Sequence, residues 1–128
     1  MTTHYQGPFE TIVQDGEVLT LTWKPETAQM KQQDFFDTML KFGDLAKEHG
    51  ATGLLVDVRT FGFRPGPEMG AFRRDHVIPR YNAAGVTGFA FLFPTRQVPA
   101  TPMQDDGSNY ASDNFDTRDA AVAWLSSL

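Results

Sequence analysis

Two apolar runs constrain the fold of this chain more than any other feature. Residues 53–58 and 86–93 are rich in branched and aromatic side chains, and each run has the length of one strand. Strands that are apolar on both faces are typical of the middle of a sheet that is covered on both sides. On the second run, Phe89, Phe91 and Phe93 share one face and smaller residues share the other. The small face predicts a closely packed helix, and the aromatic face predicts a filled opposite layer.

A β-hairpin is predicted near the N-terminus. Residues 9–14 and 17–23 alternate between apolar and polar side chains on either side of the pair Asp15-Gly16. An Asp-Gly pair between two alternating segments is a strong hairpin signal.

Three helices are predicted from the spacing of apolar residues and from their end signals. The first runs from about residue 28 to His49 and ends at Gly50. The second opens at residues 66–68 and is expected to end or kink at Pro79. The last helix begins after Asp116, which is the expected N-cap.

The predicted element order is β-β-α-β-α-β-(β)-α, in which residues 110–115 are the optional strand. This order predicts the α/β class, bordering on α+β, with a mixed sheet of four to five strands flanked by helices. The 128 residues are expected to form one domain, with residues 1–7 loosely ordered.

Composition and charge exclude several classes of function. The net charge of −5 disfavours non-specific nucleic-acid binding. The chain has no signal-peptide pattern and no apolar run long enough to span a membrane, so we expect a cytoplasmic protein. Residues 59–80 contain five arginines and two acidic residues, which predicts either a local basic patch or arginines lying over a helix face.

The usual catalytic and metal-binding motifs are absent. The sequence has no cysteine, no GxSxG, no HExxH and no phosphate-binding loop. The segment 104–109 is similar to a calcium loop only at Asp106 and is interpreted as a turn. We therefore predict no catalytic residue, no metal site and no cofactor.

The carboxyl ends of the two apolar strands are the best candidates for a site. Ligands of open α/β sheets bind outside these ends, where the second helix is also expected to begin. The predicted polar residues of this site are Asp57, Arg59, Thr60, Arg64, Arg73, Thr95 and Arg96. The alternative interpretation is a local ion pair between Asp57 and Arg59 without a ligand.

The chain resembles the STAS-type fold of anti-sigma-factor antagonists, in the branch that also includes the lipid-transfer CRAL-TRIO-like domains and many uncharacterised bacterial proteins. The resemblance covers residues 8–126 and is carried by the opening hairpin and by residues 53–59, 88–93 and 115–125. Switching antagonists have a phosphorylatable serine directly after the aspartate, whereas Val58 follows Asp57 here and the nearest hydroxyl is that of Thr60.

The resemblance implies binding and regulation. Lipid-transfer relatives imply a hydrophobic ligand, which Phe61, Phe63 and Phe72 would line unless these aromatics only complete the core. We expect a non-catalytic regulatory or ligand-binding module that binds a protein partner or a hydrophobic or anionic small ligand, with a homodimer through an apolar helix face as one option. The alternatives are a carrier of a lipid-like ligand and a small enzyme that acts on an anionic substrate at Asp57 and Arg59.

Overall fold

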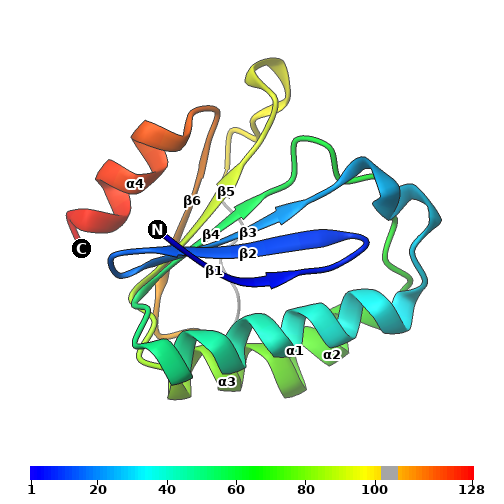
Figure 1. The fold of residues 1–128 in the computed structure, drawn as a ribbon, viewed down its shortest axis with the longest axis horizontal. Coiled ribbons are helices and arrows are strands. Elements are labelled where there is room, and N and C mark those ends of the chain that lie inside the picture. Colours follow the sequence, from blue (N-terminus) through cyan, green and yellow to red (C-terminus); the bar gives the residue numbers. More distant parts are fainter. Residues whose placement is uncertain (102–106) are drawn as a thin grey trace.

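One mixed sheet of six strands organises the protein (Figure 1). The computed structural model describes residues 1–101 and 107–128. The strands lie in the order of the sequence: β1 (Thr2–Gln6), β2 (Glu10–Asp15), β3 (Val18–Trp23), β4 (Gly53–Asp57), β5 (Gly88–Leu92) and β6 (Ala111–Phe115). β1, β2 and β3 pair antiparallel, and β3 to β6 pair parallel. The predicted α/β class and mixed sheet are confirmed, but the sheet has more strands than the predicted four to five.

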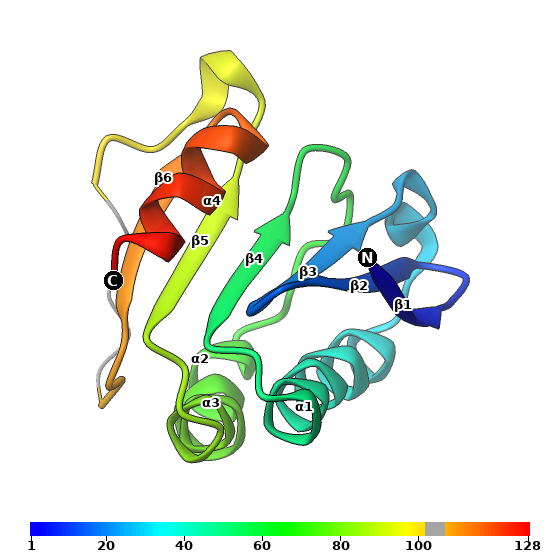
Figure 2. The ribbon, with the colours of Figure 1, turned by 60° about the vertical axis from the view of Figure 1, so that its left-hand side comes forward.

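Helices cover the two faces of the sheet unequally. Figure 2 shows α1 and α3 side by side on one face, and α4 on the other face over the end of the sheet that holds β5 and β6. The helical segments are η1 (Pro25–Gln29), α1 (Gln32–His49), α2 (Met69–Phe72), η2 (Arg73–Val77), α3 (Ile78–Ala83), η3 (Thr95–Gln97) and α4 (Arg118–Ser126).

The N-terminal residues are more ordered than the sequence predicts. Residues 1–7 were expected to be loose, but β1 pairs with β2 on both sides of an irregularity at His4. The ring of Tyr5 packs against the core and lies 3.4 Å below the ammonium group of Lys41. A side-chain anchor on α1 therefore helps to hold a polar edge strand that has little apolar alternation of its own.

The predicted hairpin is confirmed, with its loop one residue later than the Asp-Gly pair. Asp15 pairs with Val18, so that Gly16 and Glu17 form the loop. The φ angle of Gly16 is 60°, a left-handed conformation that glycine adopts without strain.

The second helix continues beyond Pro79, where it was expected to end or kink. It begins at Met69 instead of residue 66 and reaches Ala83 through the π-helical segment η2. Proline has no N–H, and its ring crowds the carbonyl four residues earlier. The wider turn, in which the N–H of Ile78 bonds to the carbonyl of Arg73, accommodates this defect without stopping the helix.

The start of α4 also corrects a prediction. Thr117 is the N-cap in place of Asp116, and its side-chain oxygen accepts a hydrogen bond from the N–H of Ala120.

Successive side chains of β4 and β5 point to opposite faces of the sheet and belong to two separate hydrophobic cores. Phe89 packs with the larger core below α1 and α3, whereas Leu55 and Ala90 pack with the smaller core below α4. The small face of β5 lets α4 approach closely, because a Cβ added at Gly88 would lie only 2.8 Å from a methyl group of Leu125. The predicted difference between the two faces of this strand is confirmed.

Candidate functional site

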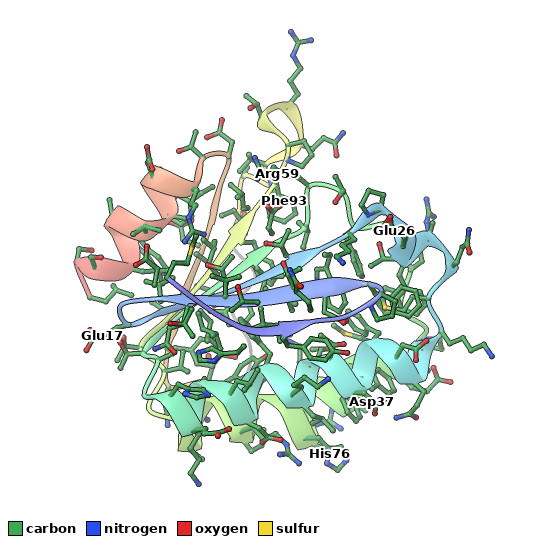
Figure 3. All side chains as sticks on the ribbon, viewed as in Figure 1. Glu17, Glu26, Asp37, Arg59, His76 and Phe93 are labelled. Atoms are coloured by element: carbon green, nitrogen blue, oxygen red, sulfur yellow. The ribbon has the colours of Figure 1, made fainter. Side chains whose placement is uncertain are left out.

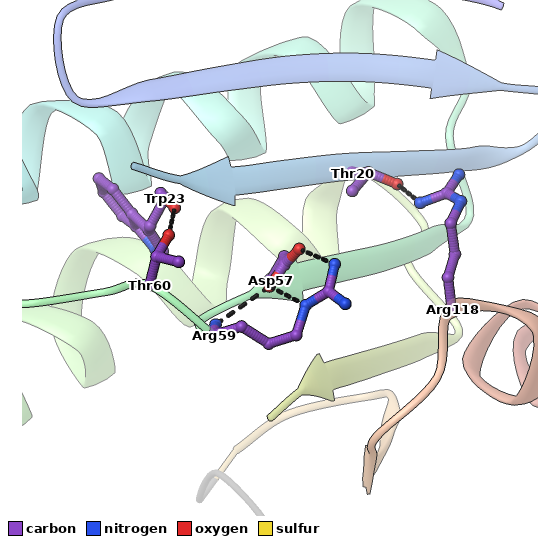
Figure 4. A network of polar contacts seen from close by, with 6 residues as sticks. All are labelled: Thr20, Trp23, Asp57, Arg59, Thr60 and Arg118. Atoms are coloured by element: carbon purple, nitrogen blue, oxygen red, sulfur yellow. Dashed lines mark hydrogen bonds and ion pairs between the residues drawn. The ribbon is translucent and has the colours of Figure 1, made fainter. Parts of the chain in front are cut away.

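Asp57 and Arg59 form a bidentate ion pair at the carboxyl end of β4 (Figure 4). The Nη2 of Arg59 lies 2.8 Å from Oδ2 of Asp57, and its Nε lies 3.1 Å from Oδ1. The backbone N–H of Arg59 also donates to Oδ1, over 3.0 Å. These hydrogen bonds to Asp57 raise the pKa of the Arg59 guanidinium above its ordinary value. Both carboxylate oxygens are thus engaged within the turn, as the alternative interpretation predicts.

The other polar residues predicted at this edge do not join the pair. Thr60 donates its hydroxyl to the carbonyl of Trp23 over 2.7 Å, which ties the turn to the end of β3. Thr95 and Arg96 are exposed in η3, and Arg64 is exposed in the loop after β4. Among the residues that the structure describes, no hydrogen bond or ion pair links these three side chains to Asp57 or Arg59.

The sheet separates Arg73 from this edge. Val56 faces the α1 and α3 side, so Asp57, the next residue, faces the α4 side. Arg73 is 7% exposed on η2, and its guanidinium carbon lies 5.3 Å from the ring centre of Phe89. The residues predicted as one site therefore lie on two faces of the sheet.

The arginine-rich segment does not make a continuous basic patch. Beside the Arg59 pair, Arg74 pairs with Asp75 over 3.0 Å and Arg80 pairs with Asp44 over 2.6 Å. The hydrogen bond between Arg74 and Asp75 raises the pKa of the guanidinium and lowers that of the carboxyl. Most of the local positive charge is matched by nearby carboxylates.

A polar row on the α4 side was not predicted from the sequence. Arg118, at the start of α4, donates Nη1 to the hydroxyl of Thr20 on β3 over 2.9 Å. Figure 4 shows this contact and the Asp57–Arg59 pair on neighbouring strands. The contact spans 98 positions of sequence, so only the folded sheet brings it together.

The predicted aromatic residues have different roles. Phe61 lines a cavity, whereas Phe63 packs on Phe35 with ring centres 5.5 Å apart. Phe72 stacks on Phe36 at 3.9 Å, between α2 and α1. One of the three predicted aromatics thus contributes directly to a ligand-sized space.

That cavity has a volume of about 160 Å³ and lies between the sheet and the α1, α2 and η2 helices. Its walls are almost wholly apolar and come from strands β3, β4 and β5 and from the surrounding helices. They include Trp23, Phe35, Val56, Phe61, Arg73 and Phe89. Pro65 is exposed and Met69 is half-buried, so the loop before α2 lies at the side of the cavity that faces solvent.

The two ends of the sheet carry different side chains. Figure 3 shows Arg59 and Phe93 at the carboxyl end of the parallel strands and Glu17 at the opposite end. The same view shows His76 pointing away from the sheet on the outer side of the helices.

No group of three or more carboxylate or imidazole side chains in the described ranges is placed to hold a metal ion. The calcium-loop residue Asp106 lies outside the described residues.

Replacing Asp57 by alanine should lower the free energy of unfolding by about 1–2 kcal/mol. The change removes a charge-assisted pair and the acceptor of the Arg59 N–H, but the Arg59 side chain is 50% exposed and solvent screens part of the gain. Urea denaturation measures the loss. Asp75→Ala, which breaks an exposed pair, is the matched control and should leave the urea midpoint nearly unchanged. Equal losses in both variants would contradict a special role of the Asp57 pair.

Comparison of the chain with protein-family models, curated proteins and solved structures finds no match. In residues 1–101 and 107–128, no helix is both long and apolar enough to cross a membrane. The resemblance to the STAS-type fold stays a prediction, and functional inference rests on the cavity and on the polar contacts of the sheet.

Proposed function

We propose that this chain is a non-catalytic module that binds a compact apolar molecule in the cavity between the sheet and the α1, α2 and η2 helices. The observation that carries the proposal is a cavity of about 160 Å³ that has almost wholly apolar walls and opens to solvent on one side. Protein interiors are close-packed, and voids much larger than a water molecule are few.

Apolar walls that do not pack against other groups lose stabilising contacts. Burial of apolar surface contributes roughly 25 cal/mol per Å², and dispersion contacts add to this gain, but both are lost where a wall faces water or empty space. A ligand that fills the cavity would supply these contacts, which favours binding as the role of the space.

The size of the cavity selects the class of ligand. An engineered apolar cavity of about 150 Å³ accommodates benzene, whereas pockets for drug-sized ligands span about 300–1,000 Å³. We therefore favour a molecule with one ring or a short branched chain over the lipid-like ligand that is the alternative. A long acyl chain would require the loop before α2 to move outward.

The chemistry of the walls favours binding over catalysis. Among the described residues, no Asp, Glu, His, Ser or Thr lines the cavity, so the walls offer no carboxylate or imidazole base and no serine or threonine nucleophile. Tyr81 and Arg73 contribute a phenol and a guanidinium to these walls. Asp57, the residue on which an enzyme was predicted to depend, faces the other side of the sheet and pairs with Arg59. An enzymatic role at that edge would require this pair to open.

The test is a titration with benzene, indole and decanoate, followed by two-dimensional amide NMR. Benzene or indole should shift the signals of residues around the cavity, Val56 and Phe89 among them, and should raise the Tm. Val56→Phe places a ring in the cavity and should abolish these shifts. Val58→Leu, at the half-buried rim, is the milder variant if Val56→Phe does not fold, and it should weaken the shifts.

Val13→Phe is the matched control, because it makes the same exchange on the α4 face of β2. It should leave ligand binding intact. If neither ring compound shifts the cavity signals at millimolar concentration, the proposed function is wrong. If decanoate alone binds and Val56→Phe blocks it, the lipid-carrier alternative replaces the compact ligand.

A further inference from the structure

The imidazole rings of His4 and His49 are stacked on each other. Their ring centres are 3.8 Å apart and their planes are 15° from parallel. His4 belongs to the edge strand β1 and His49 is the last residue of α1, so the stack joins the N-terminal strand to the end of a helix.

The side chain of Gln14 fixes the hydrogen bonding of His4. The Nε2 of Gln14 donates to the carbonyls of Gly16, over 2.9 Å, and of His49, over 3.2 Å. Its Oε1 must therefore be the acceptor that faces Nε2 of His4 at 2.8 Å. Neutral His4 then carries its proton on Nε2, and a second proton would bind at Nδ1 without breaking this hydrogen bond.

The backbone ladder is irregular at the same position. The register between β1 and β2 shifts between Thr3 and Tyr5, which leaves His4 as the extra residue of a bulge. The side-chain contacts of His4 therefore hold β1 where the backbone pairing is interrupted.

Few charged groups lie beside the stack. On α1, a carboxylate oxygen of Glu48 lies 4.0 Å from Nε2 of His49, and the helix C-terminus also favours a cation there. Lys47, in the same last turn, has the opposite effect. On β2 the contacting group, Gln14, is neutral, and Asp15 and Glu17 of the adjoining turn form no ion pair within 4.0 Å with either ring in the described part of the chain. On β1, Thr2 to Gln6 contribute no other charge. Two positive charges on the stacked rings would therefore lie close together and repel each other.

We propose that the His4–His49 stack is a pH-sensitive latch, which holds β1 on the sheet at neutral pH and loosens it when both imidazoles are protonated. Imidazoles gain their charge between pH 8 and 5, and two unit charges about 4 Å apart repel even when water screens them. Because β1 is the edge strand, its opening exposes the backbone donors and acceptors of β2. This device is independent of the cavity and of its ligand.

Hydrogen exchange of the full chain tests the latch. Protection factors of the β1 amides, corrected for intrinsic exchange, should fall about fivefold between pH 7.5 and 5.0 relative to those of β4. In His49→Gln, which keeps a polar side chain but cannot form a second cation, this extra fall should disappear. His4→Gln should behave in the same way.

The test compares the pH dependence of β1 protection in the wild type with that in the two variants. Equal pH dependence in wild type and in both variants would overturn the latch, as would unchanged β1 protection in wild type at pH 5.0. If one variant fails to fold, the other still decides the outcome, because each removes one of the two charges.

Discussion

Replacing Phe89 by alanine should lower the free energy of unfolding by about 3–5 kcal/mol, the range typical of large-to-small changes in a core. Phe89 is 1% exposed on the inner strand β5. Its ring centre lies 5.5 Å from that of Tyr81, 5.8 Å from that of Tyr110 and 4.9 Å from that of Phe91. Removing the ring would also join its space to the existing cavity, so little collapse is expected. Chemical denaturation measures the loss.

Phe93→Ala is the control for this change. Phe93 is half-buried beyond the end of β5, and its ring centre lies 6.0 Å from that of Phe91. Its replacement should cost much less, about 1 kcal/mol, because part of the ring is already in water. If Phe89→Ala does not fold, Phe89→Leu serves in its place and should still cost more than Phe93→Ala. A smaller loss from either Phe89 variant would contradict the packing described around β5.

The elements that sequence predicted well are those whose burial has a local pattern. The hairpin, α1, β4 and β5 each repeat apolar residues with the period of their own structure, and Gly50 ends α1 in a left-handed conformation with φ of 66°. β1 has no such pattern. Its order depends on Tyr5 and His4 contacting α1, and a contact between distant segments leaves no periodic signal.

The candidate site was predicted only in part, for a similar reason. Sequence placed Asp57 and Arg59 at the carboxyl end of β4, and the ion pair between them is a two-residue contact. Sequence could not show that Arg73 approaches from the opposite face, because that depends on how the second helix crosses the sheet. Of the aromatic residues predicted to line a hydrophobic pocket, only Phe61 lines the cavity, because its other walls come from separate strands and helices and its volume depends on how large rings fit together. The signal that pointed to it was Phe61, which was predicted to line a hydrophobic pocket, whereas the aromatic face of β5 predicted a filled layer.

Replacing Thr38 by valine should lower the free energy of unfolding by about 2–3 kcal/mol, although the two side chains are nearly equal in size. Glu10 on β2 is 2% exposed, and its Oε2 accepts a hydrogen bond of 2.6 Å from the hydroxyl of Thr38 on α1. Valine fills the same space but leaves a buried carboxylate oxygen without this donor, which costs more than the bond itself contributes. Thr38→Ser is the control, since it keeps the hydroxyl and loses only a methyl group worth about 0.8 kcal/mol. Urea denaturation at neutral pH compares the two variants. A loss from serine as large as that from valine would show that packing, and not the Glu10 hydrogen bond, makes position 38 important.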